Sequence, residues 1–90
     1  MGSMNVQIKI MPSSVGASLE KIKKEAKKII EEHNGTGPVF SEEPIAFGLK
    51  ALMILFTYPE EKELEELEKR LSKIVDVSSA EMIDIRRAVG

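Results

Sequence analysis

Side chains suited to acid–base chemistry or metal binding are few in this 90-residue chain, and the sequence does not group them. The chain has a single histidine, His33, and no cysteine, so the ligand sets typical of zinc sites are missing. Glu42 and Glu43 are adjacent carboxylates, but successive strand residues point to opposite faces and would not share one proton-transfer site. We interpret all three as solvated residues. The sequence therefore predicts no catalytic residue, metal site or cofactor.

Two other groups of residues have no evident role in stabilising a fold. Phe47-Gly48 falls in a predicted turn between two strands, where a large aromatic side chain would be exposed. Arg86-Arg87 falls near the end of the last predicted strand. Two structural explanations stay open at this point: Phe47 could fold back onto the core, and the arginines could only protect a sheet edge from pairing.

Composition limits the classes of function. The 13 basic and 15 acidic residues give a formal charge of −2, which argues against a general nucleic-acid binder. No apolar stretch approaches the roughly 20 residues of a membrane span, and no signal sequence opens the chain, so we expect a cytoplasmic protein without membrane contact. Residues 1–3, which precede a second methionine at Met4, look like a cloning scar. We expect residues 4–90 to form one domain.

Hydrophobic periodicity predicts alternating strands and helices. Residues 5–10 alternate as a strand with one buried face, and Ser18 caps a helix that ends at Asn34-Gly35. Residues 39–46 form a weaker strand, in which Pro44 lacks a ladder donor and so indicates a sheet edge. Further elements are predicted at residues 49–58 (a buried strand), 60–75 (an amphipathic helix) and 77–87 (a strand).

The two halves of the chain repeat at an offset of about 45 residues. Five apolar positions of the first helix recur in the second: Leu19, Ile22, Ala26, Ile29 and Ile30 correspond to Leu64, Leu67, Leu71, Ile74 and Val75. The same offset carries Val6, Ile8 and Ile10 onto Ala51, Met53 and Leu55. These three would then face the helices, and Leu52, Ile54 and Phe56 would form an apolar open face. That face could dock a partner, or it could be covered by the loop before Pro44.

Two split βαβ halves in the order β-α-β-β-α-β predict an α+β ferredoxin-like sandwich, with a four-stranded antiparallel sheet and two helices on one face. RNA-recognition modules share this fold, but they carry stacking aromatics where this chain has Ile8, Ile10 and the apolar run 52–55. An acylphosphatase-like enzyme would need an arginine in the loop at 12–16, which has none. The glycines at 35–37 lead into a strand, not into the helix of a phosphate-binding loop.

Three stretches resemble the archaeal elongation factor 1-beta family. They are Ile8-Lys9-Ile10-Met11-Pro12, the block from Glu43 to Leu52, and Asp84-Ile85-Arg86-Arg87, and the resemblance covers essentially the whole chain from Met4. The middle block, which contains Ile45-Ala46-Phe47-Gly48, is the most specific of the three. The resemblance implies a guanine-nucleotide exchange factor for the translation GTPase elongation factor 1-alpha, with the α+β fold predicted above.

The family resemblance also implies roles for individual residues. Phe47, beside Gly48, would fill a pocket on the GTPase, and Arg87, with Arg86 next to it, would reach towards the magnesium and phosphate-loop region. Eukaryotic members carry a lysine at the position of Arg87, so here a planar guanidinium takes the place of an ammonium. The eukaryotic proteins also carry N-terminal extensions, whereas this chain looks like the exchange domain alone.

Two alternatives from other classes stay open. The first is a small-molecule-binding regulatory module of the same fold, which would normally act as a dimer. The second is a phosphate-ester hydrolase. An exchange factor would instead be a monomer that binds a GTPase and no metabolite.

Overall fold

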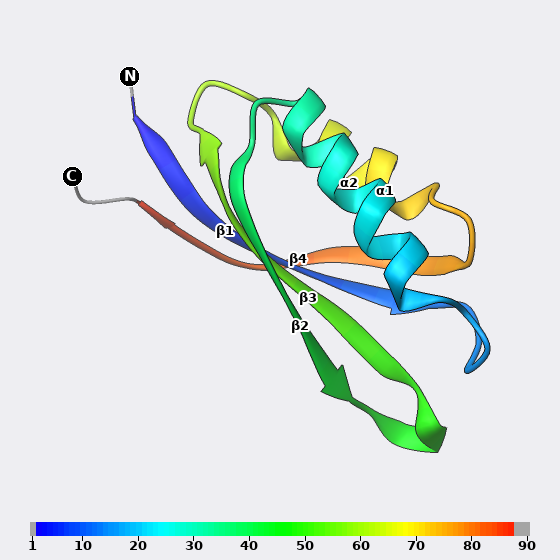
Figure 1. Cartoon of the computed structure of the whole chain (residues 1–90). Coiled ribbons are helices and arrows are strands. Elements are labelled where there is room, and N and C mark those ends of the chain that lie inside the picture. The colour runs from blue at the N-terminus through cyan, green and yellow to red at the C-terminus, as the bar shows by residue number, and fades with distance from the viewer. Residues whose placement is uncertain (1, 88–90) are drawn as a thin grey trace.

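The computed structural model describes residues 2–87, which form one antiparallel sheet covered on one face by two helices (Figure 1). The strand order is β2-β3-β1-β4, so the first and third strands are central and the second and fourth lie at the edges. This confirms the predicted ferredoxin-like arrangement. In chain order the elements are β1 (Ser3–Pro12), α1 (Leu19–Glu32), β2 (Thr36–Pro44), the short 3-10 turn η1 (Ala46–Gly48), β3 (Lys50–Pro59), α2 (Leu64–Ser72) and β4 (Val77–Arg87).

Local signals at both ends of α1 are the ones that the sequence predicts. The Ser18 hydroxyl oxygen accepts a hydrogen bond from the Lys21 backbone amide at 3.4 Å, which satisfies one of the free donors of the first turn. Asn34 follows the helix at a φ of 69°, a left-handed conformation that asparagine tolerates. Gly35 then passes so close to the helix that a β-carbon there would overlap Ile30. Only glycine allows this close return of the chain towards β2.

The hydrophobic core lies between the helices and one face of the sheet. Val6, Ile8 and Ile10 of β1 face the helices, and Ile8 is paired with Ile54 across the central strands. Phe56 and Tyr58 pack edge to face with ring centroids 5.9 Å apart. The remaining buried core residues are Ile22, Ala26, Ile29, Ile30, Leu52, Leu67, Leu71 and Ile74.

The predicted facing of β3 is wrong. Leu52, Ile54 and Phe56 lie in the core and not on the open face, whereas Leu55 lies on the open face and is half exposed. The buried positions of β3 match those of β1 at an offset of 46, one residue more than the offset of the helices. A slip of one residue exchanges the two faces of a strand, so the open-face docking surface predicted at Leu52, Ile54 and Phe56 does not exist.

The second helix is shorter than its predicted span of 60–75. Residues 60 and 61 lie in a turn, in which the Lys62 amide donates to the Pro59 carbonyl oxygen at 3.3 Å, and α2 begins only at Leu64. The helix ends at Ser72, and Lys73 is its C-terminal cap. Val75, which the repeat places on the buried stripe, therefore lies beyond the helix and is 81% exposed.

The alkaline titration of Tyr58 tests whether this side chain is buried in the core. Its side chain is 1% exposed, and burial, followed by the negative charge of Glu66, raises its pKa above the ordinary value. The folded state therefore favours the protonated phenol. The stability that Tyr58 contributes is fully present below about pH 10, the pKa of tyrosine in an unfolded chain, and is lost as pH rises through the folded pKa.

We expect tyrosinate absorbance to appear at higher pH in the folded protein than in the urea-unfolded chain. Tyr58 is the only tyrosine and the chain has no tryptophan, so the signal has one source. Tyr58→Phe should flatten the alkaline loss of stability measured by urea unfolding. Equal titration midpoints in the two states would contradict the burial argument.

Candidate functional site

The turn between β2 and β3 presents Phe47 at its tip. Phe47 has a φ of 63° and Gly48 a φ of 77°, two consecutive left-handed residues as in a type I′ hairpin turn. The Leu49 amide donates to the Ala46 carbonyl oxygen at 3.3 Å, and the Ile45 amide donates to the Leu49 carbonyl oxygen at 2.8 Å. These bonds fix the turn, and Figure 1 shows that it projects beyond the helix layer.

Phe47 is unfavourable for the isolated fold in two ways. A left-handed residue with a β-carbon costs roughly 1–2 kcal/mol, and the preference at this turn position is for asparagine, aspartate or glycine. The ring is also 94% exposed, so it gains no burial in return. The structure thus excludes the interpretation in which Phe47 folds back onto the core. Neither burial nor packing within residues 2–87 therefore offsets the strain at Phe47.

Gly48 serves the turn through its backbone. A β-carbon at this position would meet no atom within 4 Å, so lack of space is not what requires a glycine. Its positive φ is the requirement, because an L side chain is strained there. Gly48 thereby sets the direction of Phe47.

Arg86 and Arg87 lie at the end of β4 and point to opposite sides of the sheet. Arg86 is paired with Asn5 of β1 on the open face, and Arg87 is paired with Met4, which packs against the core. Each arginine also has one carboxylate partner. The Nε atom of Arg86 lies 3.1 Å from Oδ2 of Asp84, and that of Arg87 lies 3.1 Å from Oε1 of Glu60.

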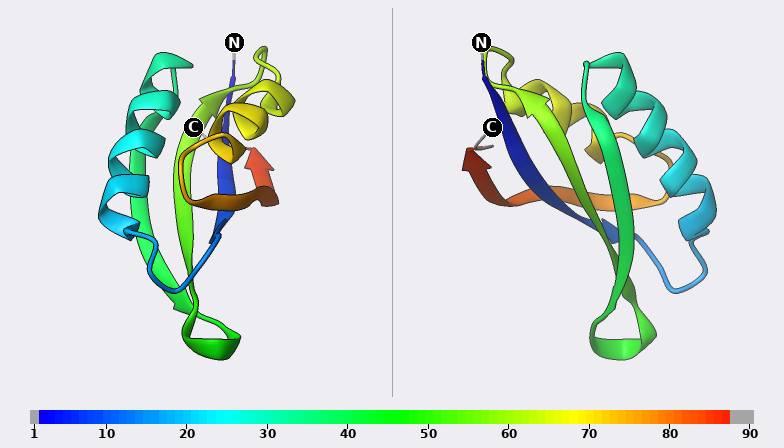
Figure 2. Two further views of the ribbon diagram at one scale, coloured as in Figure 1. Left: turned by 90° about the vertical axis from the view of Figure 1, so that its right-hand side faces the viewer. Right: turned by 60° about the vertical axis from the view of Figure 1, so that its left-hand side comes forward.

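The structure does not bring Phe47 and the arginines together. Phe47 precedes β3, whereas Arg87 pairs with Met4, which is itself paired with Tyr58 near the end of β3. At about 3.3 Å per strand residue the two groups are roughly 30–35 Å apart, in a molecule whose longest dimension is 42 Å. Figure 2 shows the hairpin tip and the red end of β4 at opposite ends of the sheet. The predicted site residues are therefore two separate groups.

Sequence reasoning missed a charged clamp at the base of the hairpin. The Glu42 carboxylate lies 3.5 Å from Nζ of Lys23 on α1 and 3.9 Å from Nζ of Lys50 on β3. The expectation of a solvated edge charge is thus only partly right, because Glu42 also ties β2 to the helix layer. No spacing in the sequence reveals this contact, since Lys23 and Glu42 meet only in the folded chain.

Two further properties concern residues 2–87 as a whole. Within that range, no three residues among histidine, aspartate and glutamate gather closely enough to hold a metal ion. The helices of the same range are too short and too polar to span a membrane. His33, the lone histidine, has its Nδ1 atom 2.9 Å from the Ile29 carbonyl oxygen at the end of α1.

Comparison with known proteins gives one consistent family. Residues 5–88 match the family model described as the EF-1 guanine nucleotide exchange domain. An elongation factor 1-beta of Methanothermobacter thermautotrophicus is 41% identical over 97% of this chain and 98% of its own length. Similar proteins of the same name occur in Methanosarcina barkeri, at 38% identity over 97% of this chain and 99% of that protein, and in Methanocaldococcus jannaschii, at 33% over 98% and 100%.

Proposed function

We propose that this chain, which belongs to the EF-1 guanine nucleotide exchange domain family, binds the translation GTPase elongation factor 1-alpha. Two contacts at opposite ends of the sheet would make this binding. The protein is a guanine-nucleotide exchange factor, which promotes release of GDP and rebinding of GTP during translation elongation. Residues 4–90 would act as one exchange domain, as a monomer in the cytoplasm. The observation that carries the proposal is the strained and exposed Phe47.

Exchange by such a protein needs no covalent chemistry. GDP on a GTPase is held by phosphate-loop contacts and by magnesium bridging its oxygens. A protein that binds the nucleotide-free GTPase more tightly than the GDP form must weaken GDP binding by the same factor, because coupled binding equilibria are reciprocal. GTP then rebinds and expels the exchange factor. Every residue role proposed below is therefore a binding role.

Phe47 would supply the anchor of the first contact. A preformed, hydrogen-bonded turn presents the ring, so little backbone entropy is lost when a pocket on the GTPase closes around it. Buried aromatic residues at the centre of interfaces are the commonest hot spots. Gly48 would act indirectly, through the turn geometry that aims the ring.

Arg87 would supply the second contact, with a guanidinium that disturbs the magnesium and phosphate site. In the free protein it pairs with Glu60 at the surface. Exposed ion pairs contribute about 0–1 kcal/mol, so the partner can replace Glu60 at little cost. Arg86 lies on the other side of the sheet. It would contribute at most a general positive charge to the contact.

The distance between the two contacts constrains the partner. Phe47 and Arg87 lie roughly 30–35 Å apart along the sheet, so the GTPase must present an apolar pocket and its nucleotide site at a similar separation. Anchoring at one end would raise the effective concentration of the arginine at the other end. The rigid sheet between them would transmit the strain that opens the nucleotide site.

The ion-pair partners of the two arginines give a matched pair of variants. Glu60→Gln releases Arg87, and Asp84→Asn releases Arg86, each by removal of one surface carboxylate charge. We expect Glu60→Gln to raise the exchange rate up to about fivefold, because a surface pair of about 0–1 kcal/mol no longer competes with the GTPase. We expect Asp84→Asn to leave the rate within about twofold, and both variants to keep the melting temperature. Equal effects of the two substitutions on the rate would argue against a distinct role for Arg87.

The function as a whole is tested by release of fluorescent GDP from elongation factor 1-alpha with and without this protein. Catalytic amounts should accelerate release, and excess unlabelled GTP should restore free exchange factor. Gel filtration with candidate metabolites tests the regulatory-module alternative, which requires a ligand-dependent dimer. If an acyl phosphate stays intact in the presence of the protein, the phosphate-ester hydrolase alternative is excluded.

A further inference from the structure

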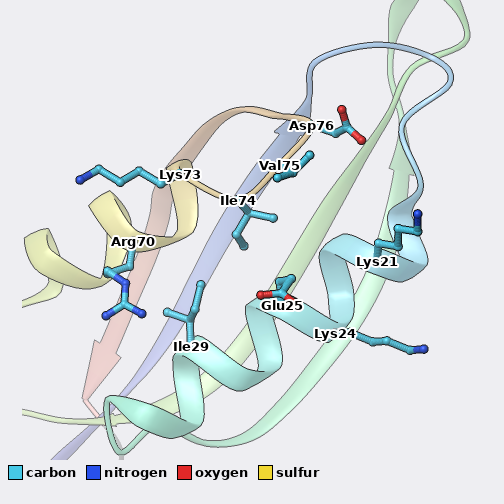
Figure 3. A pocket seen from close by; sticks show the side chains of 9 residues that line it. All are labelled: Lys21, Lys24, Glu25, Ile29, Arg70, Lys73, Ile74, Val75 and Asp76. Carbon is cyan, nitrogen blue, oxygen red and sulfur yellow. The ribbon is translucent and has the colours of Figure 1, made fainter.

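A groove between the two helices lies on the face of the protein opposite the open face of the sheet. It encloses about 470 Å³, and its floor is formed by Ile29 of α1 and Ile74 beyond α2. Figure 3 shows these two side chains projecting towards each other across the space between the helices. Neither lies in the hairpin or at the end of β4, so the groove is separate from both contacts proposed above.

Four basic residues line this groove. Lys21 and Lys24 come from α1, and Arg70 and Lys73 come from α2 and its cap. All four are exposed, and among residues 2–87 no carboxylate oxygen lies within 4.0 Å of their charged nitrogens. Two acidic residues, Glu25 and Asp76, also line the groove, which leaves a local excess of two positive charges in a protein of net charge −2.

Val75 adds a large exposed aliphatic side chain beside these cations. It is 81% exposed although the sequence repeat predicts it to be buried. The turn that carries it is well fixed: the Val77 amide donates to the Ile74 carbonyl oxygen at 3.1 Å, and the Asp76 carbonyl oxygen accepts from the Ser13 amide at 2.8 Å. Asp76 holds a φ of 68° to complete the turn. The exposure of Val75 is therefore part of the folded structure.

We propose that this groove binds an acidic segment of another protein that carries aliphatic anchor residues. An aliphatic side chain of that segment packs on Ile29, Ile74 and Val75, where it removes apolar surface from water. Flanking carboxylates lie beside the unpaired lysines and Arg70, which supply the complementary charge. The pattern is that of an amphipathic segment in a helix-lined groove.

Nucleic acid fits the same groove less well. Single-stranded RNA is held by aromatic stacking together with cationic contacts, and none of the residues that line the groove is aromatic. The acidic net charge of the protein also opposes general binding of polyanions. The aliphatic floor of the groove and the four basic residues that line it together favour an acidic protein segment.

The test uses a short synthetic peptide with two leucines at helical spacing flanked by glutamates, titrated into the isotopically labelled full chain and followed by NMR. Shifts should centre on Ile29, Ile74 and Val75. Val75→Ser should weaken binding roughly fivefold, because part of the apolar contact is lost. Val75 is exposed, so its replacement should leave the melting temperature unchanged. A peptide with glutamine in place of glutamate should bind at least about fivefold more weakly.

A matched pair of double variants separates the groove from general charge. Lys21→Gln with Arg70→Gln removes two charges from the groove, and Lys27→Gln with Lys69→Gln removes two charges from the same helices outside it. We expect the first pair to weaken peptide binding about fivefold and the second to change it less than twofold, with GDP exchange unchanged in both. Equal effects of the two pairs, or peptide shifts outside the groove, would overturn the proposal.

Two further occupants are decided by the same variants. An oligouridine strand that binds more tightly than the glutamate peptide, and is weakened by the groove pair, would identify a nucleic-acid site instead. Self-association in sedimentation that the groove pair abolishes would identify a second copy of this chain as the occupant. Either result contradicts an acidic partner segment.

Discussion

Phe47→Ala is expected to weaken binding to nucleotide-free elongation factor 1-alpha by about 2 kcal/mol or more, the scale of a hot-spot aromatic. The ring is 94% exposed in the free protein, so its removal opens no cavity. The melting temperature should therefore stay the same or fall only slightly. Binding measured by calorimetry and unfolding followed by circular dichroism give the two quantities separately.

Two control variants make this result specific. Phe47→Asn introduces a residue that tolerates the positive φ. It should weaken binding as much as Phe47→Ala does while leaving the turn at least as stable. Val39→Ser removes a different exposed apolar side chain, 62% exposed on the neighbouring strand β2, and should leave binding within about twofold. Normal exchange together with a large loss of melting temperature in Phe47→Ala would show that the ring is structural.

Arg87→Ala is expected to lower the exchange rate by roughly tenfold or more, the scale of a lost hydrogen bond to a charged group. Affinity for the nucleotide-free GTPase should fall by a smaller factor, because the proposed role of the guanidinium is to disturb magnesium and the phosphates during release. The two quantities are measured by stopped-flow release of fluorescent GDP and by calorimetry.

Magnesium chelation and Arg86 supply the controls for this prediction. A chelator carries out artificially the step assigned to Arg87, so it should narrow the difference in rate between mutant and wild type. Arg86→Ala removes the same charge from the opposite side of the sheet and should lack the magnesium-dependent defect. If the two alanine variants behave alike, or the Arg87 defect persists undiminished in chelator, the arginine pair is only a charged docking patch.

Most of the architecture could be predicted because it depends on local signals. Ser18 caps α1 through its own side chain, and Asn34 ends the helix through its own backbone preference. Pro44 lacks the donor that an inner strand needs, and β2 is an edge strand. Each of these signals involves a few neighbouring residues, so no knowledge of distant contacts is required.

The facing of β3 was not predictable in the same way. Residues 51–54 are buried without alternation, so periodicity did not show which side meets the helices. The prediction relied on the helix offset of 45, but the connection between strand and helix is one residue shorter in the second half, and the strands match at 46. One residue is enough to exchange the faces of a strand. The predicted end of α2 was wrong for a related reason, because Val75 continues the apolar pattern although the chain turns at Asp76.

The sequence by itself determined the order of the elements, the edge position of β2 and the glycine turn between β2 and β3, because these follow from backbone preferences and hydrophobic periodicity. It left open whether Phe47 in that turn is exposed or folds back onto the core, and the structure shows it exposed. Only the tertiary structure decided how far Phe47 lies from the arginines, that Arg87 pairs with Glu60, and that Val75 stands beside a cationic groove. These are relations between segments distant in the chain. They depend on strand register and on where each helix stops, which packing of the whole core sets and no local pattern encodes.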